Sequence, residues 1–255
     1  MIAIERISFS YTKEKPLFTD FSWTVQPGET WSVLGMSGCG KTTLLYLLAG
    51  LLHPDSGSIK ILGQTIGRPR PQTGLILQDY GLLPWATVRE NAMLGLRLRG
   101  FYGPDGTHAP RDQSSIDTGV VDEWIKRLQI DGVQEHYPSQ ISGGQRQRTA
   151  IARTLALHPD LLLMDEPFSS LDAVISEDLQ DLTLQLCREQ QITLVVITHS
   201  IEEAAVLGQK VLLLSRAPQT KPVIIENPQN AQPNYRYSPD YFRTVNDLRD
   251  RLEAN

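Results

Sequence analysis

One octet decides the fold of this 255-residue chain, and it reads Gly35-Met36-Ser37-Gly38-Cys39-Gly40-Lys41-Thr42. It matches the pattern G-x-x-x-x-G-K-[ST] without a gap, and it follows the short apolar run Trp31–Leu34 and precedes a helical pattern, Thr43–Gly50. A strand before and a helix after are the context that this phosphate-binding pattern demands. Glycines let successive backbone N–H groups converge on phosphate oxygens, and the helix N-terminus adds partial positive charge. The octet therefore predicts a nucleoside triphosphate site, with an ordinary glycine-rich turn as the alternative.

The residues of this phosphate loop have separate expected roles. Lys41 is expected to reach the β- and γ-phosphates, and the Thr42 hydroxyl to ligate Mg²⁺. Cys39 lies beside Lys41 and a helix start, which are conditions that lower the pKa of a thiol. We therefore hypothesise that alkylation of Cys39 inhibits hydrolysis of the nucleoside triphosphate and that the bound nucleotide protects the thiol. The expected nucleotide contacts are Gly35, Met36, Ser37, Gly38, Cys39, Gly40, Lys41, Thr42 and Thr43.

Two acidic residues follow a second apolar run. Asp165 and Glu166 come directly after Leu161–Met164. Open α/β sheets bind their ligands at the carboxyl ends of parallel strands. Asp165 is therefore expected to hold magnesium through water, and Glu166 to polarise the attacking water. A solvated strand end with two incidental acids is the alternative.

The segment Ile141–Arg148 begins another helix. Ser142 and Gln145 have the spacing of a capping box, so a plain helix start explains both residues. It does not explain Gly143 and Gly144, because each glycine in a first turn costs helix stability. Bare backbone at a helix N-terminus suits a phosphate, so a second phosphate cradle and a plain helix start both stay open at this point.

The rest of the chain predicts an α/β sheet domain with an inserted helical part. Short continuous apolar runs alternate with helical patterns, which is typical of a parallel sheet covered by helices. The first sixty or so residues instead alternate apolar with polar positions, as half-buried strands do. Between Trp85 and Gln140 only helical patterns occur, and Gly100–Gly119 is predicted to be an exposed loop. The proline-rich tail after Ser215 is too short for its own core, so we expect it to pack on the main body.

Composition excludes several classes of protein. There are 24 Lys and Arg against 29 Asp and Glu, a formal net charge of −5, so no basic surface for nucleic acid is expected. The longest apolar run, Leu44–Leu52, has nine residues, where a membrane span needs roughly 20. Two distant cysteines, Cys39 and Cys187, favour a reducing compartment, and the first residues have no secretory signal pattern.

Taken together, these motifs resemble the ATP-binding subunit of an ATP-binding cassette (ABC) transporter. The resemblance covers roughly residues 2–215 and departs from the family's signature only at Ile141, where leucine is usual. It implies an α/β fold with a P-loop NTPase (RecA-like) core, a mostly parallel sheet, an N-terminal antiparallel β subdomain and an inserted α-helical subdomain. The implied division is residues 1–84 and 146–215 for the core, 85–145 for the helical subdomain and 216–255 for the tail. The matching motifs are Gly35–Thr42, Gln78, Ile141–Gln145, Asp165–Pro167, Ser170–Asp172 and His199.

The resemblance also implies a head-to-tail homodimer that sandwiches two ATP molecules. Each ATP then lies between one copy's phosphate loop and Ser142, Gly143, Gly144 and Gln145 of the other copy. Asp172 is implied at the dimer interface.

Three further roles are implied near the nucleotide. Tyr11 resembles the aromatic residue that stacks on adenine, with an ordinary edge tyrosine as the alternative. Gln78 is implied to sense Mg²⁺ and the γ-phosphate. His199 is implied to contact the γ-phosphate and to hold Glu166 in position.

A surface for membrane partners is implied near Tyr80, Leu82, Leu83 and Trp85. The string Leu-Leu-Pro-Trp followed by Thr-Val-x-Glu-Asn resembles the nitrate, sulfonate and taurine importers, a group with relatives for thiamine-precursor pyrimidines. The expected partners are separate transmembrane permease subunits and, indirectly, an extracytoplasmic substrate-binding protein, which implies a location on the cytoplasmic face of the membrane. A lipoprotein or peptide exporter and a non-transport ABC ATPase stay open as alternatives.

Overall fold

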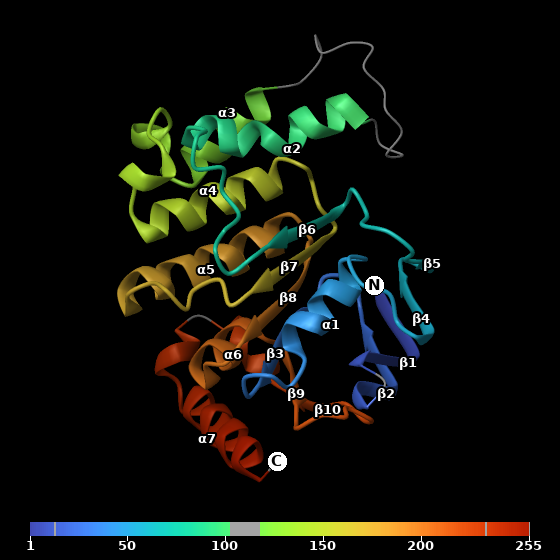
Figure 1. Ribbon diagram of the computed structural model, residues 1–255. Coiled ribbons are helices and arrows are strands. Elements are labelled where there is room, and N and C mark those ends of the chain that lie inside the picture. The colour runs from blue at the N-terminus through green and yellow to red at the C-terminus, as the bar shows by residue number, and fades with distance from the viewer. Residues whose placement is uncertain (13, 103–117, 233, 255) are drawn as a thin grey trace.

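A six-stranded sheet forms the centre of the molecule (Figure 1) in the computed structural model, which describes residues 1–12, 14–102, 118–232 and 234–254. The strand order is β10-β9-β3-β8-β7-β6, and only β10 runs antiparallel to its neighbour. Every residue of β3, β7 and β8 is buried, as expected for parallel strands covered on both faces. The strands are β3 (Thr30–Gly35), β6 (Thr73–Ile76), β7 (Leu161–Asp165), β8 (Thr193–Thr198), β9 (Lys210–Leu214) and β10 (Val223–Glu226).

A second, antiparallel sheet covers one side of the core. Its order is β2-β1-β4-β5, and α1 (Lys41–Leu48) shares one buried apolar cluster with both sheets. Leu161 and Leu163 of β7 belong to that cluster, whereas Leu162 and Met164 belong to the cluster on the opposite face. The alternation follows from the two-residue period of a strand. The strands of this sheet are β1 (Ile2–Thr12), β2 (Lys15–Val25), β4 (Ser56–Ile61) and β5 (Gln64–Thr65).

Helices cover the other face of the central sheet. The helices α2 (Val88–Tyr102) and α3 (Gly119–Arg127) pack on α4 (Gly143–Leu155), which in turn contacts β6 and α5 (Ala173–Glu189). The predicted loop Gly100–Gly119 lies mostly outside the described residues, although its first residue ends up inside α2 and its last begins α3. Helix α4 contacts the helices α2 and α3 as well as strand β6 of the central sheet. The predicted boundary between the helical subdomain and the core, near residue 145, therefore stays a prediction.

The tail after Ser215 packs against the edge of the core. It consists of β10, two short 3-10 turns at Pro228–Ala231 and Tyr235–Tyr237, and α7 (Pro239–Glu253). Val245 and Leu248 of α7 share a buried cluster with Ala204 and Ala205 of α6 (Ile201–Leu207), and Figure 1 shows the two helices side by side. Within the described ranges, no helix is both long and apolar enough to span a bilayer.

Candidate active site

The phosphate loop bends where its glycines allow it. A Cβ on Gly35 would lie 2.6 Å from both the Cys39 Sγ and the Leu214 carbonyl oxygen, so only glycine fits there. Gly40 directly precedes α1 and has a φ of 106°, in the left-handed region that favours glycine. The local geometry therefore requires glycine at both ends of the loop.

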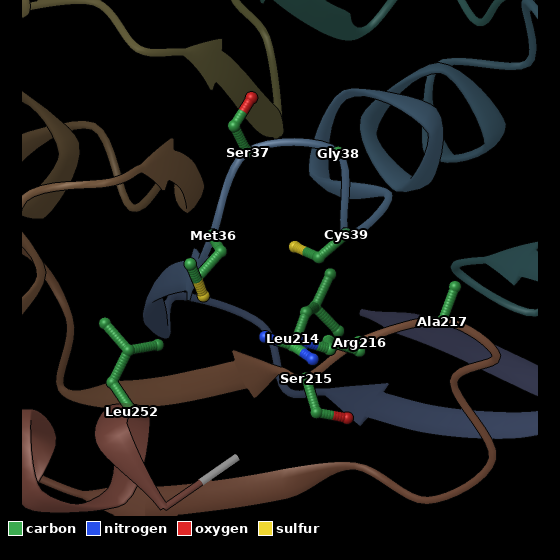
Figure 2. A pocket seen from close by; sticks show the side chains of 9 residues that line it. All are labelled: Met36, Ser37, Gly38, Cys39, Leu214, Ser215, Arg216, Ala217 and Leu252. Atoms are coloured by element: carbon green, nitrogen blue, oxygen red, sulfur yellow. The ribbon is translucent and has the colours of Figure 1, made fainter.

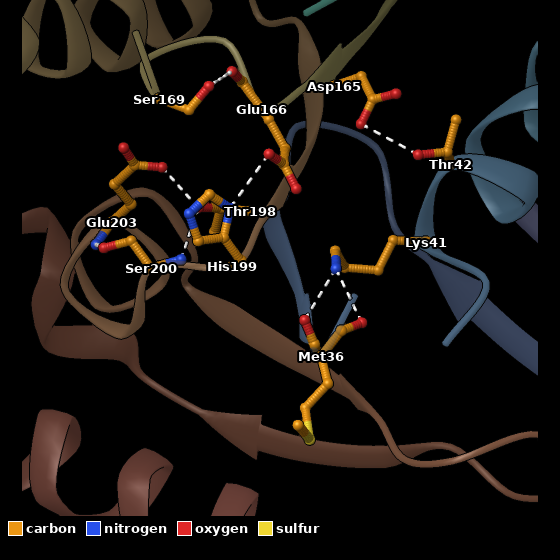
Figure 3. A network of polar contacts seen from close by, with 11 residues as sticks. Met36, Lys41, Thr42, Asp165, Glu166, Ser169, Thr198, His199, Ser200 and Glu203 are labelled. Carbon is orange, nitrogen blue, oxygen red and sulfur yellow. Dashed lines mark hydrogen bonds and ion pairs between the residues drawn. The ribbon is translucent and has the colours of Figure 1, made fainter. Parts of the chain in front are cut away.

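The side chain of Lys41 folds back onto the phosphate loop. Its side chain is buried, and Nζ donates to the carbonyl oxygens of Gly35 at 2.8 Å and Met36 at 3.1 Å (Figure 3). A buried ammonium group whose partners are neutral carbonyls remains in need of an anion. The loop thus fits a phosphate group, in agreement with the octet.

Thr42, at the start of α1, lies close to Asp165, the last residue of β7. The Thr42 hydroxyl donates to Asp165 Oδ1 at 3.4 Å. Burial raises the pKa of the Asp165 carboxyl, the charge of Glu166 raises it further, and the Thr42 hydrogen bond lowers it. A partly desolvated carboxylate beside a hydroxyl oxygen is a pair of hard donors, the chemistry that Mg²⁺ prefers. The two residues therefore fit the predicted magnesium site.

Glu166 and His199 are within hydrogen-bond distance, with Oε2 and Nδ1 3.1 Å apart (Figure 3). Glu166 has a φ of 44°, which is uncommon for a residue other than glycine. Its backbone is held on both sides, since its N–H donates to Ile197 O at 2.9 Å and its carbonyl accepts from the Ser169 hydroxyl at 3.0 Å. The backbone thus points this carboxylate out of the strand end toward His199.

The helix start at Ser142 has the predicted capping box. Ser142 Oγ accepts from Gln145 N–H at 3.3 Å, and Gln145 Oε1 accepts from Ser142 N–H at 3.0 Å. A Cβ on Gly143 would lie 2.9 Å from Leu171 Cδ2, and one on Gly144 would lie 2.7 Å from Ile175 Cγ2. Close packing against the start of α5 is therefore a reason for both glycines that the sequence pattern did not reveal.

Within one chain, this helix start is not brought to the phosphate loop. Figure 1 shows the N-terminal end of α4 at the outer end of the helical layer, well separated from the loop that leads into α1. The N-terminus of α4, the second possible phosphate site, is thus separated from the phosphate loop of the same chain.

Tyr11, Gln78 and Asp172, also implied by the family resemblance, lie on different elements, and their roles stay predictions. The Tyr11 hydroxyl is 3.1 Å from Thr43 Oγ1 and its ring is mostly exposed. Gln78 is exposed just beyond the end of β6. Asp172 caps α5, because its Oδ1 accepts from Ile175 N–H at 3.1 Å.

The expected docking surface is only partly at the surface. Trp85 is 74% exposed, but Tyr80 is buried, and its hydroxyl lies 2.8 Å from Ser170 Oγ. Tyr80 therefore faces inward, toward the segment before Asp172, and the surface is left to Trp85 with the half-buried Leu82 and Leu83.

Asn91 is a residue whose role the sequence reasoning missed. Its fully buried amide accepts from Leu83 N–H at 2.7 Å and donates to the carbonyl oxygens of Leu83, Ala86 and Thr87 at 2.9–3.1 Å. It holds the Leu83–Ala86 loop against α2. The sequence does not show that Asn91 is buried, and without its burial nothing marks this asparagine as structurally important.

The expectation of a low thiol pKa at Cys39 is wrong. Cys39 is buried, and this burial raises the pKa of the thiol more than the charge of Lys41 lowers it. Its Sγ points toward a small cavity of about 170 Å³ between the phosphate loop and the end of β9, where Leu252 of α7 also contributes (Figure 2). Desolvation of the thiol thus raises its pKa more than Lys41 and the backbone hydrogen bonds at the helix start lower it.

Residues 18–169 match the protein family described as ABC transporter. The chain belongs to the ABC transporter family. The family assignment, the expected α/β fold and the ATPase class are thereby confirmed.

Named relatives and solved structures agree with this family. The nitrate import ATP-binding protein NrtC of Synechococcus elongatus is 37% identical over 92% of this chain and 35% of that protein, so the chain spans about a third of that relative. The taurine import ATP-binding protein TauB of Escherichia coli is 41% identical over 80% of this chain and 76% of TauB.

Two solved structures of the cassette MJ0796 cover 89% of this chain and 98% of their own at 26% identity. The dimeric bacterial ABC transporter cassette has a TM-score of 0.74, and the dimeric post-hydrolysis state bound to ADP and Pi has a TM-score of 0.72.

Proposed function

We propose that this chain is the ATP-hydrolysing subunit of an ABC importer for a small anion or organic solute. The observation that supports it most directly is the Glu166–His199 pair beside Lys41, Thr42 and Asp165 at the carboxyl ends of neighbouring strands. A phosphate-binding loop, a magnesium-binding pair and a carboxylate oriented by histidine are what hydrolysis of a phosphoanhydride requires.

Each of these side chains has a distinct role in the proposed reaction. Lys41 binds the β- and γ-phosphates in place of its present carbonyl partners. Glu166 accepts a proton from the attacking water, as a general base does. His199 orients Glu166 and donates to the γ-phosphate, and Gln78 completes the site from the end of β6.

Thr42 and Asp165 are the residues that hold Mg²⁺ in this proposal. When bound, Mg²⁺ neutralises negative charge on the phosphate oxygens. The oxygen donors and the raised pKa of Asp165 support this assignment, since a nearby cation relieves the cost of an ionised buried carboxyl.

The functional unit is proposed to be a head-to-tail homodimer. Ser142, Gly143, Gly144 and Gln145 lie far from the phosphate loop of their own chain, so a second copy is needed to bring such a helix start to the nucleotide. Tyr11 stacks on adenine and Asp172 lies at the interface in this arrangement. The dimeric structures of MJ0796 support it by analogy.

The membrane partners are proposed to be separate permease subunits that dock against Leu82, Leu83 and Trp85 on the cytoplasmic side. The exposed Trp85 and the loop held by Asn91 support this location. The names of NrtC and TauB favour import of a small anion or a sulfonate, delivered by an extracytoplasmic binding protein.

Reconstitution tests this proposal. The chain is purified with the permease subunits encoded beside it, placed in vesicles, and supplied with the neighbouring binding protein loaded with nitrate, taurine or a thiamine-precursor pyrimidine. We expect one loaded binding protein to stimulate ATP hydrolysis and solute uptake together. ATP hydrolysis that neither the permease subunits nor any loaded binding protein stimulates, with no solute uptake, would contradict the importer assignment while leaving the ATPase assignment intact.

A further inference from the structure

The C-terminal tail contacts the helix that follows His199. Helix α6 begins at Ile201, two residues after His199, and has seven residues, so it is about 10 Å long. Its last four residues are buried, and a helix of about two turns moves as one rigid body.

At its N-terminal end, α6 is tied to the residues on both sides of His199. Thr198 Oγ1 accepts from Ser200 N–H at 3.0 Å and donates to Glu203 Oε2 at 2.5 Å. Ser200 Oγ accepts from Glu203 N–H at 3.1 Å. The backbone of His199 is thus enclosed in the cap of α6 (Figure 3).

At its C-terminal end, α6 leaves carbonyl groups without helical partners, as every helix does. Two side chains of the tail supply the missing donors. Asn227 Nδ2 donates to Ala205 O at 2.7 Å and to Gly208 O at 2.8 Å, and Asn230 Nδ2 donates to Val206 O at 3.1 Å. The accepting residues are all buried, so losing these donors leaves carbonyls unsatisfied away from water.

Asn227 is itself held rigidly. It is 1% exposed, its N–H donates to Gln209 O at 2.7 Å, and its Oδ1 accepts from the Tyr235 hydroxyl at 2.6 Å. The Tyr235 hydroxyl oxygen also lies 3.1 Å from Thr244 Oγ1 of α7. The amide therefore has a fixed orientation, in which the Tyr235 hydroxyl of the tail holds its oxygen and the carbonyls of Ala205 and Gly208 hold its nitrogen.

We propose that Asn227 is a positioning residue for His199: through α6 it fixes the imidazole against Glu166, and this gives the tail a role in ATP hydrolysis. The inference rests on the proposed role of His199. A displacement near 1 Å at a catalytic group can cost about 100-fold in rate, so a cap 10 Å away is close enough to matter.

Two variants of the full chain test the inference. Asn227→Asp keeps the size of the side chain but replaces both donors, and Tyr235→Phe removes only the hydroxyl that orients the amide. We expect kcat for ATP to fall by about tenfold and about threefold respectively, with KM and the affinity for a fluorescent ATP analogue changed by less than about twofold. Tyr237→Phe, two positions from Tyr235 and 78% exposed, is the matched control and should leave kcat unchanged.

The same variants are then combined with His199→Ala. If the tail acts through His199, neither substitution lowers the residual rate of the His199→Ala protein further. An equal fold-loss in both backgrounds would overturn the inference, as would unchanged kcat in folded variants. If Asn227→Asp does not fold, Tyr235→Phe decides the matter alone. Normal hydrolysis by His199→Ala itself would instead contradict the proposed role of His199, which is a different result.

Discussion

His199 Nδ1 lies 3.1 Å from Glu166 Oε2, and this pair joins the carboxyl ends of two adjacent strands. Residues Asp165 and Ile197 are paired in the parallel ladder of β7 and β8, so Glu166 and His199 follow the ladder at nearly the same level. The sheet register thereby brings together a base and the group that orients it, although 33 positions separate them in the sequence.

We expect Glu166→Gln to bind ATP normally and to hydrolyse it about 10²- to 10⁴-fold more slowly, the usual contribution of a general base. Because ATP stays uncleaved, the variant should accumulate as a dimer. Phosphate release and size-exclusion chromatography with ATP measure the two effects. Glu135→Gln, an exposed change in the helical layer, is the control. Normal turnover by Glu166→Gln would show that another group is the base.

Lys41→Ala should weaken nucleotide binding by about 10- to 100-fold, since a charge-assisted hydrogen bond to phosphate is lost. Titration with a fluorescent ATP analogue measures the affinity. The exposed Lys126→Ala removes the same charge elsewhere and should have no effect. Equal affinity in both variants would exclude Lys41 as a phosphate ligand.

Asp165→Asn should raise the Tm of the nucleotide-free protein at pH 7 by about 2–4 °C. The folded state raises the pKa of Asp165, mainly by burial, so folding disfavours its ionised form. The folded state then binds more protons than the unfolded one, and this residue's contribution to stability falls as the pH rises.

The advantage of Asp165→Asn is therefore largest above the raised pKa and shrinks as the pH falls toward the unfolded value of 3.8. Thermal unfolding at several pH values checks this dependence. The same variant should gain less stability than wild type from Mg²⁺ and ATP together, and a lower Tm at pH 7 without nucleotide would contradict the burial argument.

Both cysteines should react slowly with a thiol reagent near neutral pH. Burial raises the pKa of Cys187 to about 12 and also raises that of Cys39. We expect Cys39 labelling to accelerate as the pH rises, because the thiolate is the reactive form. Mass spectrometry of the Cys187→Ser variant, with and without ATP, measures the rate of Cys39 labelling at each pH. Fast labelling at pH 7 would restore the original hypothesis of an activated thiol.

Gly144→Ala should destabilise the chain by about 1–3 kcal/mol through overpacking, since its Cβ would lie 2.7 Å from Ile175 Cγ2. Adding Ile175→Ala makes room and should recover much of the lost Tm. Chemical denaturation of the single and double variants measures this coupling. If the pair restores stability but not ATPase activity, the glycine is also needed at the nucleotide.

The sequence by itself determined the parts of this protein that depend on neighbours along the chain. The phosphate loop, the capping box at Ser142 and the acidic end of β7 are each built from a few consecutive residues, so local geometry suffices to predict them. Apolar runs also predicted the buried strands, since a strand covered on both faces is mostly apolar.

Tertiary structure alone decided which groups are buried and what they contact. Cys39 has a raised rather than a lowered pKa because the end of β9 and the tail cover it, and Tyr80 faces Ser170 instead of solvent. Asn91 and Asn227 became informative only when the fold buried them against backbone carbonyls. Desolvation and long-range hydrogen bonds depend on segments far apart in the chain, and no local pattern contains them.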